Sequence, residues 1–232
     1  MSALVEINNI CKIYNPGENE VRALDHVSVS IDEGEFVAII GQSGSGKSTL
    51  MNMLGCLDVP TSGEYRLHGQ NVSELTDNEL SDIRNREIGF IFQGFNLIAN
   101  LTALENVELP LIYRGVPRGE RVRLARTALE KVGLGKRMEH KPAEMSGGQQ
   151  QRVAIARAIA QAPPIILADE PTGNLDSRST EEIMAILQEL YEDGRTVILI
   201  THNNEIADRA KRIIQIKDGK IESDTRTGTE NK

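Results

Sequence analysis

Residues 36–49 read FVAIIGQSGSGKST and join a strand pattern, a glycine-rich loop and a helix start without a break. The first five residues, Phe36–Ile40, are all apolar, which favours a strand buried on both faces of a parallel sheet. In the loop that follows, glycines let backbone N–H groups turn inward around phosphate oxygens. The helix that begins near Lys47 adds the positive end of its dipole. The stretch therefore predicts a strand, a phosphate-binding P-loop and a helix.

The P-loop pattern gives individual side chains of the loop a chemical task. Lys47 would hold the β- and γ-phosphates of a nucleotide, and the Ser48 hydroxyl would ligate Mg²⁺. An ordinary loop rich in glycine and serine is the alternative, and the strand and the helix on either side argue against it. The residues that we expect around the phosphates are Gly41, Ser43, Gly44, Ser45, Gly46, Lys47, Ser48 and Thr49.

A second apolar strand ends in two acidic residues. The segment Ile165–Ala168 is followed by Asp169 and Glu170, which places both carboxylates at the carboxyl edge of a sheet, where α/β proteins bind ligands. Asp169 is suited to hold Mg²⁺, and Glu170 to orient and deprotonate an attacking water. An acidic pair after a strand is often a helix cap or a solvated edge. In combination with the P-loop, the pair favours nucleotide hydrolysis.

The whole chain is predicted to form one α/β domain, residues 1–232, with an inserted helical lobe at about residues 94–160. Strands rich in β-branched residues are predicted over Leu4–Tyr14, Val27–Ile31, Phe36–Ile40, Ile88–Phe92, Ile165–Ala168 and Thr196–Ile200. Apolar periodicity predicts helices over Ser48–Leu57, Arg118–Val132, Gly147–Ala160 and Thr180–Tyr191. Asp218-Gly219 is a hairpin-turn signal, and the polar chain that follows predicts a flexible tail at about residues 223–232.

The composition of the 232 residues is that of a globular protein, with 39% hydrophobic and 26% charged residues. The formal net charge of −8 argues against a dedicated nucleic-acid binder, whose affinity rests on clustered Lys and Arg. Cys11 and Cys56 are too few for a disulfide framework and lack metal-ligand spacing, so we expect reduced, structural thiols. Apolar runs are strand-sized and the first residues lack a signal-peptide pattern. We therefore expect a cytoplasmic protein that reaches a membrane through a partner.

Residues 145–150, MSGGQQ, narrow the class of NTPase. They resemble the LSGGQ signature of ABC ATPases, with Met145 in place of the usual Leu. Physically, Ser146 is suited to cap the helix that follows, and the two glycines allow an anion to approach the backbone closely. An ordinary capped helix is the alternative on these residues alone. The resemblance implies that the nucleotide is contacted by Ser146, Gly147, Gly148 and Gln149.

Four further positions match the same family, in the family's order along the chain. Tyr14 matches the aromatic residue that stacks on adenine, and Gln93 matches the residue that contacts Mg²⁺ and moves with the permease. Asp176 matches the D-loop, and His202 matches the switch histidine beside the γ-phosphate. A lone Gln, His or Tyr at a strand end is usually structural, so the argument rests on the matches occurring together.

Within the family, the chain resembles the MacB, LolD and FtsE branch of macrolide-export, lipoprotein-release and division proteins. The stretches that carry this resemblance are residues 15–18 (NPGE), 21–24 (VRAL), 92–97 (FQGFNL), 105–111 (ENVELPL) and 172–176 (TGNLD). Permeases of this branch are separate or fused chains with few membrane helices and a large outer domain. They resemble mechanical transmitters more than conventional substrate channels.

The resemblance implies an ATPase with the ABC ATPase fold, in which a P-loop core with a mainly parallel sheet carries an N-terminal antiparallel β subdomain and the helical lobe. It implies Mg²⁺ held by Ser48, Gln93 and Asp169, and catalysis by Glu170, His202, Lys47 and Gln93. ATP would lie between the P-loop of one subunit and the signature of another, in a head-to-tail homodimer. The expected partner at the cytoplasmic face of the membrane is a permease with a large extracytoplasmic domain, and an adaptor protein is a further candidate.

Two other functions fit this sequence. One is an FtsE-like regulatory ATPase that gates a cell-envelope enzyme through its membrane partner, and the sequence does not separate it from export. The other is a soluble ABC ATPase without a permease; such proteins commonly carry paired ATPase domains, coiled-coil insertions or basic extensions, which we do not find here. The sequence identifies neither the cargo nor its direction.

Apolar residues in a predicted surface loop indicate where a permease would bind. Phe95, Leu97 and Ile98 lie within the segment Gln93–Leu101, where exposed apolar side chains favour a binding site. The alternative is that these side chains pack into the helical lobe.

Overall fold

The middle of the chain forms a unit of its own. In the computed structural model, which describes residues 3–17 and 19–227, Asn85–Asp193 cluster as one unit, called the lobe unit here. The chain up to Arg84 and the chain from Gly194 onward cluster as the other, called the P-loop unit. The lobe unit is therefore continuous in sequence, whereas the P-loop unit is assembled from both ends of the chain.

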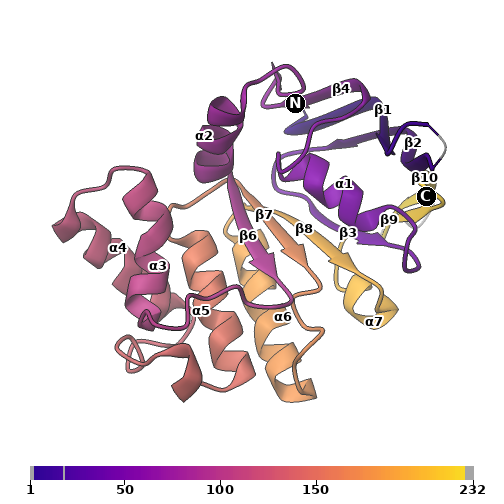
Figure 1. The fold of residues 1–232 in the computed structure, drawn as a ribbon. Coiled ribbons are helices and arrows are strands. Elements are labelled where there is room, and N and C mark those ends of the chain that lie inside the picture. The colour runs from indigo at the N-terminus through magenta and orange to yellow at the C-terminus, as the bar shows by residue number, and fades with distance from the viewer. Residues whose placement is uncertain (1–2, 18, 228–232) are drawn as a thin grey trace. The chain divides into compact units, whose positions relative to one another are not determined.

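The first sheet of the P-loop unit is antiparallel, with the strand order β2-β1-β4-β5. Figure 1 labels β1, β2 and β4 of this sheet. Its strands are β1 (Val5–Tyr14), β2 (Val21–Ile31), β4 (Ser62–Leu67) and β5 (Gln70–Asn71). Buried and exposed residues alternate strictly from Val27 to Ile31, as expected for a sheet with one face on the core. This sheet is the N-terminal antiparallel β subdomain that the family resemblance implied.

The other strands of the P-loop unit are mainly parallel. β3 pairs in parallel with β8 and β9, and β10 is antiparallel to β9. The strands are β3 (Phe36–Ile40), β8 (Thr196–Thr201), β9 (Arg212–Lys217) and β10 (Lys220–Arg226), and the helices that follow β3 and β8 are α1 (Lys47–Leu54) and α7 (Asn204–Ala207). Every residue of β8 is buried, which explains why its middle residues, 197–200, are apolar without alternation.

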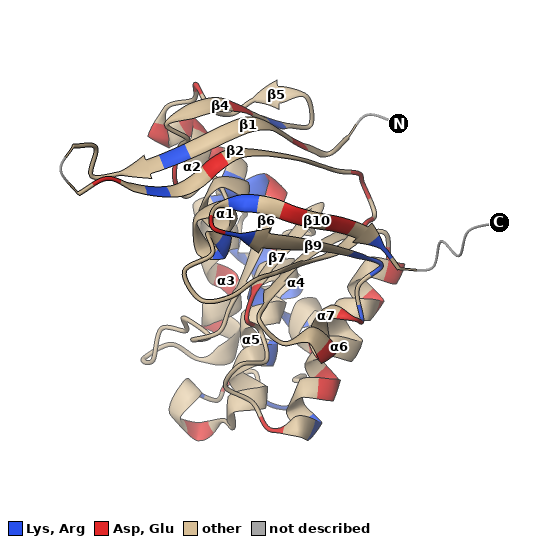
Figure 2. Ribbon diagram, turned by 90° about the vertical axis from the view of Figure 1, so that its right-hand side faces the viewer, with Lys and Arg blue, Asp and Glu red and all other residues tan. Residues whose placement is uncertain are grey.

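The C-terminal hairpin has its turn at Asp218-Gly219, as predicted. The flexible tail predicted from about residue 223 is wrong for its first residues, which belong to β10. β10 runs to Arg226, and Arg212 holds it by donating to both carboxylate oxygens of Asp224 at 2.7 Å. The charged residues along β10 are visible in Figure 2. The sequence predicted a tail because β10 is an exposed edge strand, and the residues of such a strand are largely polar. The ion pairs that hold the strand cannot be recognised in the sequence. The remainder of the predicted tail, residues 228–232, lies outside the described residues.

The lobe unit combines two parallel strands with helices. The strands are β6 (Ile88–Phe92) and β7 (Ile165–Asp169), and the helices are α3 (Ala103–Tyr113), α4 (Arg118–Lys131), the short 3-10 helix η1 (Pro142–Glu144), α5 (Gly147–Ile159) and α6 (Ser177–Glu192). Helices α3, α4 and α5 pack against one another (Figure 1). Their fully buried side chains include Val107, Leu111, Ala125, Leu129 and Val153.

Three α-helices were not predicted from the sequence: α2, α3 and the four-residue α7. The helix α2 (Asp77–Glu87) buries only Leu80, so it has no apolar stripe that could reveal it. The helix α3 contains Pro110, a residue that usually ends a helix because it lacks an N–H. Within the described parts of the chain, no helix is both long and apolar enough to cross a bilayer.

Candidate functional site

The P-loop connects β3 to α1 through two left-handed glycines. Gly44 has φ 77° and Gly46, the N-cap of α1, has φ 107°. A Cβ at Gly44 would meet nothing within 4 Å, but one at Gly46 would lie 2.6 Å from the carbonyl oxygen of Ala23. Gly44 is therefore required for its backbone conformation alone, and Gly46 also for a close approach to β2.

Polar groups of the P-loop point to an anion. The Lys47 ammonium lies over the loop and donates to the carbonyl oxygens of Gly41 and Gln42 at 2.6 and 2.8 Å. The Ser45 side chain is buried, and its Oγ has no hydrogen-bond partner among the described residues. Buried hydroxyl groups normally have partners, so this loop fits a ligand that brings its own oxygens. Phosphate at a helix N-terminus is such a ligand.

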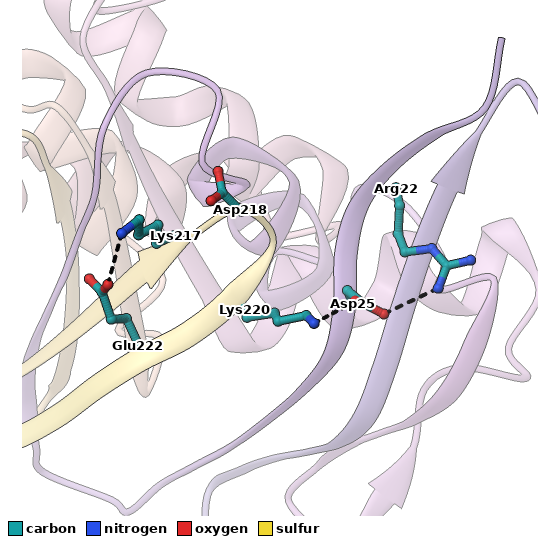
Figure 3. Close-up of a pocket in the computed structure, with 6 residues that line it drawn as sticks. All are labelled: Arg22, Asp25, Lys217, Asp218, Lys220 and Glu222. Atoms are coloured by element: carbon teal, nitrogen blue, oxygen red, sulfur yellow. Dashed lines mark hydrogen bonds and ion pairs between the residues drawn. The ribbon is translucent and has the colours of Figure 1, made fainter.

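The turn of the C-terminal hairpin supports the P-loop, which the sequence did not indicate. The Gly219 N–H donates to the Ser45 carbonyl oxygen at 2.9 Å, and the Asp25 N–H donates to the Gly219 carbonyl oxygen at 2.8 Å. Gly219 has φ 75°, and a Cβ there would lie 2.9 Å from the carbonyl oxygen of Ala23. The turn thus fits between β2 and the P-loop only as glycine. Figure 3 shows Asp218, the other residue of this turn, in the pocket beside β2.

Tyr14 ends β1 and is anchored through its hydroxyl. The hydroxyl donates to Asp58 Oδ2 at 3.0 Å and also hydrogen-bonds Thr49, in the first turn of α1. Partial burial and the Asp58 carboxylate raise the pKa of Tyr14 above its ordinary value, so the hydroxyl keeps the proton that it donates to Asp58. The Lys12 ammonium lies 5.1 Å from the ring centroid, a distance at which it attracts the π face. Tyr14 therefore lies beside the helix that follows the P-loop.

His202 and the P-loop leave neighbouring strands at the same edge. The parallel register pairs Ile40 of β3 with Thr201 of β8. The next residues along the chain are Gly41 and His202. His202 is exposed, which suits a side chain that contacts a ligand at this edge.

In the lobe unit, Gln93 and Glu170 share an edge in the same way. The register pairs Phe92 of β6 with Asp169 of β7, so Gln93 and Glu170 follow at neighbouring positions. Glu170 has φ 45°, an uncommon conformation for a residue with a side chain and one that clusters at functional sites. Asp169 and Glu170 are both half-buried.

Gln93 is held by the segment that matches the D-loop. Its Nε2 donates to Asn174 Oδ1 at 3.3 Å, and Asn174 Nδ2 donates back to the Gln93 carbonyl oxygen at 3.1 Å. A Cβ at Gly173 would lie 2.6 Å from Gln93 Nε2. Asp176 caps α6, since its carboxylate accepts the N–H and the hydroxyl of Ser179, each at 2.9 Å. These hydrogen bonds lower the pKa of Asp176.

The signature begins α5, as its sequence predicted. Ser146 is the N-cap: its Oγ accepts the Gln149 N–H at 3.3 Å, and Gln149 Oε1 accepts the Ser146 N–H at 3.1 Å. A Cβ at Gly148 would lie 2.5 Å from Ser179 Oγ, so this glycine is also needed for the close packing of α5 on α6. Ser146 is exposed. Capping of α5 therefore does not bury Ser146.

Sequence reasoning missed three polar residues that position the loops of the lobe unit. Buried Gln151 donates to the Pro171 carbonyl oxygen at 2.6 Å. Arg157 donates to the Phe95 carbonyl oxygen at 2.9 Å. Asn106, which is fully buried, accepts the Ile98 N–H at 2.8 Å. Their helical positions resemble ordinary core or surface positions, and only the fold reveals that their partners are loop backbone groups.

The predicted site residues fall into two sets, one in each unit of the chain. The P-loop unit holds Tyr14, Gly41, Ser43, Gly44, Ser45, Gly46, Lys47, Ser48, Thr49 and His202. The lobe unit holds Gln93, Ser146, Gly147, Gly148, Gln149, Asp169, Glu170 and Asp176. Within each set, the positions at strand ends share one sheet edge.

Comparison with known proteins identifies the family. A family model for ABC transporters matches residues 24–173. The macrolide export ATP-binding/permease protein MacB of Hyphomonas neptunium is 56% identical over 222 residues, which are 96% of this chain and 34% of that protein. An uncharacterised ABC transporter ATP-binding protein of Thermotoga maritima is 54% identical over 98% of this chain and 97% of that protein. This chain thus spans about a third of the length of its MacB relatives.

Solved structures agree with the sequence comparison. The ATP-binding cassette MJ0796, in a dimeric post-hydrolysis state bound to ADP and Pi, matches with a TM-score of 0.87 and 50% identity, over 96% of this chain and 98% of that one. A second dimeric structure of MJ0796, described as a bacterial ABC transporter cassette, matches equally well. With a fold and an identity of this level, this chain belongs to the ABC transporter family and is an ATP-binding ATPase related to the MacB-type export proteins.

Proposed function

We propose that this chain is the subunit that powers a membrane permease of the MacB type from the cytoplasmic face of the membrane. The observation that carries the proposal is that one chain has two separate helix N-termini whose sequence and structure suit an anion. One is the P-loop with the unpartnered Ser45 hydroxyl, and the other is the exposed Ser146 N-cap of α5. A composite ATP site, made from the P-loop of one subunit and the signature of a second copy, uses both.

Each site residue has a role in this proposal. Lys47 and the P-loop amides bind the β- and γ-phosphates, and Tyr14 stacks on adenine. Glu170 accepts a proton from the attacking water, and His202 contacts the γ-phosphate. Asp176, beyond its capping role, contributes to the subunit interface.

The oxygen-rich donors Ser48, Gln93 and Asp169 fit Mg²⁺, which prefers hydroxyl, carbonyl and carboxylate ligands. When bound, the ion would supply positive charge that neutralises the phosphates during transfer. These three side chains would hold it and keep the phosphates oriented toward Glu170.

The segment Gln93–Leu101 is the proposed docking surface for the permease. Asn106 fixes its backbone by accepting the Ile98 N–H and donating to the Leu101 carbonyl oxygen at 3.2 Å. This leaves the Ile98 side chain 48% exposed. A rigid loop that displays an apolar side chain and follows directly from Gln93 could transmit changes at the nucleotide to a membrane partner. An adaptor protein is a further proposed partner.

Export is favoured over gating of an envelope enzyme. The relatives include the macrolide export protein MacB and a pyoverdine export protein, PvdT of Pseudomonas fluorescens, which is 56% identical over 97% of this chain and 34% of that protein. Both are described as ATP-binding/permease proteins. Purifying this chain from membranes and identifying its partner by mass spectrometry tests the proposal, and recovery without any integral-membrane partner would contradict it.

Glu170→Gln tests the composite site directly. Glutamine keeps the size and the hydrogen-bonding capacity of Glu170 but removes the base, so hydrolysis should fall by about 10²- to 10⁴-fold. Gel filtration should then show a monomer without nucleotide and a dimer with ATP. Adding Ser146→Arg should restore the monomer, because the long side chain blocks the partner's phosphates. Hydrolysis near the parental rate, or no ATP-dependent dimer, would sink the composite site.

A further inference from the structure

A β-bulge brings three metal-ligating residues together on the antiparallel sheet of the P-loop unit. The register of β1 and β2 shifts between Ile10 and Lys12, so that Cys11 alone faces two residues, Asp25 and His26. A bulge of this kind redirects side chains, and bulges are frequent beside functional sites. His26 has φ 58°, a left-handed conformation that is uncommon for residues other than glycine.

The three side chains meet closely. Cys11 Sγ lies 3.3 Å from His26 Nδ1, and the same nitrogen lies 2.8 Å from Asp25 Oδ1. One ligand atom from each residue lies within 4.8 Å of the other two. The backbone N–H of His26 also donates to Sγ at 3.3 Å, a contact that stabilises sulfur when it carries negative charge. A thiol, an imidazole and a carboxylate are therefore in place around one point.

One residue of the cluster is buried in the sheet and another is exposed to solvent. Cys11 is only 6% exposed, whereas the side chain of His26 is 60% exposed. The sheet thus fixes the sulfur, while an ion from solvent can reach the imidazole. A binding site needs such an entry path.

Neighbouring charges are arranged around the Asp25 carboxylate. Lys220 Nζ lies 3.0 Å from Oδ2 (Figure 3). Oδ1 lies 2.8 Å from His26 Nδ1. Arg22 also contacts Oδ1, at 3.3 Å, but its side chain is 48% exposed and has a second acidic partner in Glu20 at 3.3 Å. Arg22 can therefore move away from Asp25 Oδ1 and still keep an acidic partner, Glu20.

We propose that Cys11, Asp25 and His26 bind one Zn²⁺ ion through Sγ, a carboxylate oxygen and Nδ1, with water as the fourth ligand. Zinc bond lengths of about 2.3 Å to sulfur and about 2.0 Å to nitrogen place those two atoms about 3.5 Å apart in a tetrahedron. Sγ and Nδ1 need to separate by only a few tenths of an ångström from their 3.3 Å. The thiol proton passes to solvent as the sulfur ligates the ion, and Nδ1 ligates from the neutral tautomer of His26 that carries its proton on Nε2. Thiolate and imidazole are donors that zinc accepts and that Mg²⁺ does not favour.

Co²⁺ is the probe for this site. Thiolate-ligated Co²⁺ shows a sulfur-to-metal charge-transfer absorption, which the oxygen donors of the proposed Mg²⁺ site cannot produce. We expect the metal-free full-length chain to bind one thiolate-ligated Co²⁺, with an absorption that disappears when Zn²⁺ displaces it. Absence of this absorption at any Co²⁺ concentration would overturn the proposal.

Four variants locate the ligands. Cys11→Ser should abolish the absorption, and Cys56→Ser, which changes the other cysteine, should retain it; burial raises the pKa of the Cys56 thiol to about 11. His26→Asn removes the imidazole while tolerating the left-handed backbone, and Asp25→Asn removes the charge while keeping the shape. Each of these two should weaken Zn²⁺ binding by at least about tenfold, with the basal ATPase rate of His26→Asn as the check that the protein folds. Absorption that survives Cys11→Ser, or unchanged Zn²⁺ affinity in His26→Asn and Asp25→Asn, would refute the site.

Discussion

Gln151 Nε2 donates a hydrogen bond to the carbonyl oxygen of Pro171 at 2.6 Å. Gln151 lies on α5, the helix that begins with the signature, and Pro171 directly follows Glu170. The same nitrogen donates to the carbonyl oxygen of Phe92 at 3.4 Å, one residue before Gln93. One buried amide therefore positions the backbone beside both Glu170 and Gln93.

Gln151→Met should impair both stability and hydrolysis. Methionine has a similar size but no donor, so the buried Pro171 carbonyl oxygen loses the hydrogen bond from Gln151, while the Phe92 carbonyl oxygen keeps the Phe95 N–H at 3.2 Å. The free energy of unfolding should fall by about 1–3 kcal/mol, because a buried acceptor is left unsatisfied. Hydrolysis should slow while ATP affinity changes little, because the P-loop is untouched. Urea denaturation and steady-state ATPase assays measure the two effects. Gln188→Met is the control: Gln188 bonds only Glu192 on the surface of α6, and an equal loss in both variants would count against the positioning role.

Tyr14→Ala should weaken ATP binding several-fold without abolishing hydrolysis. Aromatic stacking contributes about 0.5–1.5 kcal/mol beyond burial, and alanine removes it. Tyr14→Phe keeps the ring and loses only the hydroxyl's hydrogen bonds with Asp58 and Thr49, so its ATP affinity should stay near that of the parent. Fluorescent-nucleotide titration measures both. If Tyr14→Ala binds ATP as tightly as the parent, Tyr14 does not stack on adenine.

Ile98→Glu should uncouple the ATPase from the permease. A charge on the docking surface opposes apolar contact with the partner but leaves the buried Asn106 contacts intact, so basal ATPase should be unchanged and permease-stimulated ATPase should be lost. Ile112→Glu is a matched control, since Ile98 and Ile112 are both 48% exposed and Ile112 lies on α3, outside Gln93–Leu101. The comparison is made in proteoliposomes with the co-purified partner. If Ile98→Glu unfolds the chain, the segment is part of the lobe core instead; Leu97 is already half-buried there.

Gly219→Ala should weaken ATP binding although Gly219 lies far along the chain from the P-loop. The added Cβ would lie 2.9 Å from the Ala23 carbonyl oxygen, so the turn must shift and the hydrogen bond to Ser45 must weaken. Gly69→Ala controls for backbone strain, because Gly69 has the same φ of 75° and nothing within 4 Å of a Cβ. Both variants should lose about 1 kcal/mol or more of stability, but only Gly219→Ala should lose ATP affinity by isothermal titration. Equal affinities would show that the turn does not support the loop.

Features with a local cause could be predicted from the sequence. The strand Phe36–Ile40, the P-loop and the Ser146 cap each follow from a few neighbouring residues, and the structure has them where the sequence put them. The same holds for the turn at Asp218-Gly219. These features needed no knowledge of what packs against them.

Features with a distant cause could not be predicted. Asn106 and Gln151 are polar residues on helices, and their acceptors lie in loops that become neighbours only in the fold. The cluster at Cys11 depends on a register shift between two strands, which no spacing of Cys and His in the sequence indicates. The strand β10 was read as a tail because the partner of Asp224, Arg212, lies on another strand.

The division of the chain into a continuous and a discontinuous unit imposes an order on its synthesis. A ribosome delivers Asn85–Asp193 in one piece, so the lobe unit has all its own residues before β8 and the C-terminal hairpin are made. Until then, β3 lacks both of its parallel partners, and the Ser45 carbonyl lacks Gly219. Apolar strands that stay unpaired during translation are the segments at risk of misassembly. The nascent chain therefore gains a supported nucleotide loop only when β9 and β10 emerge.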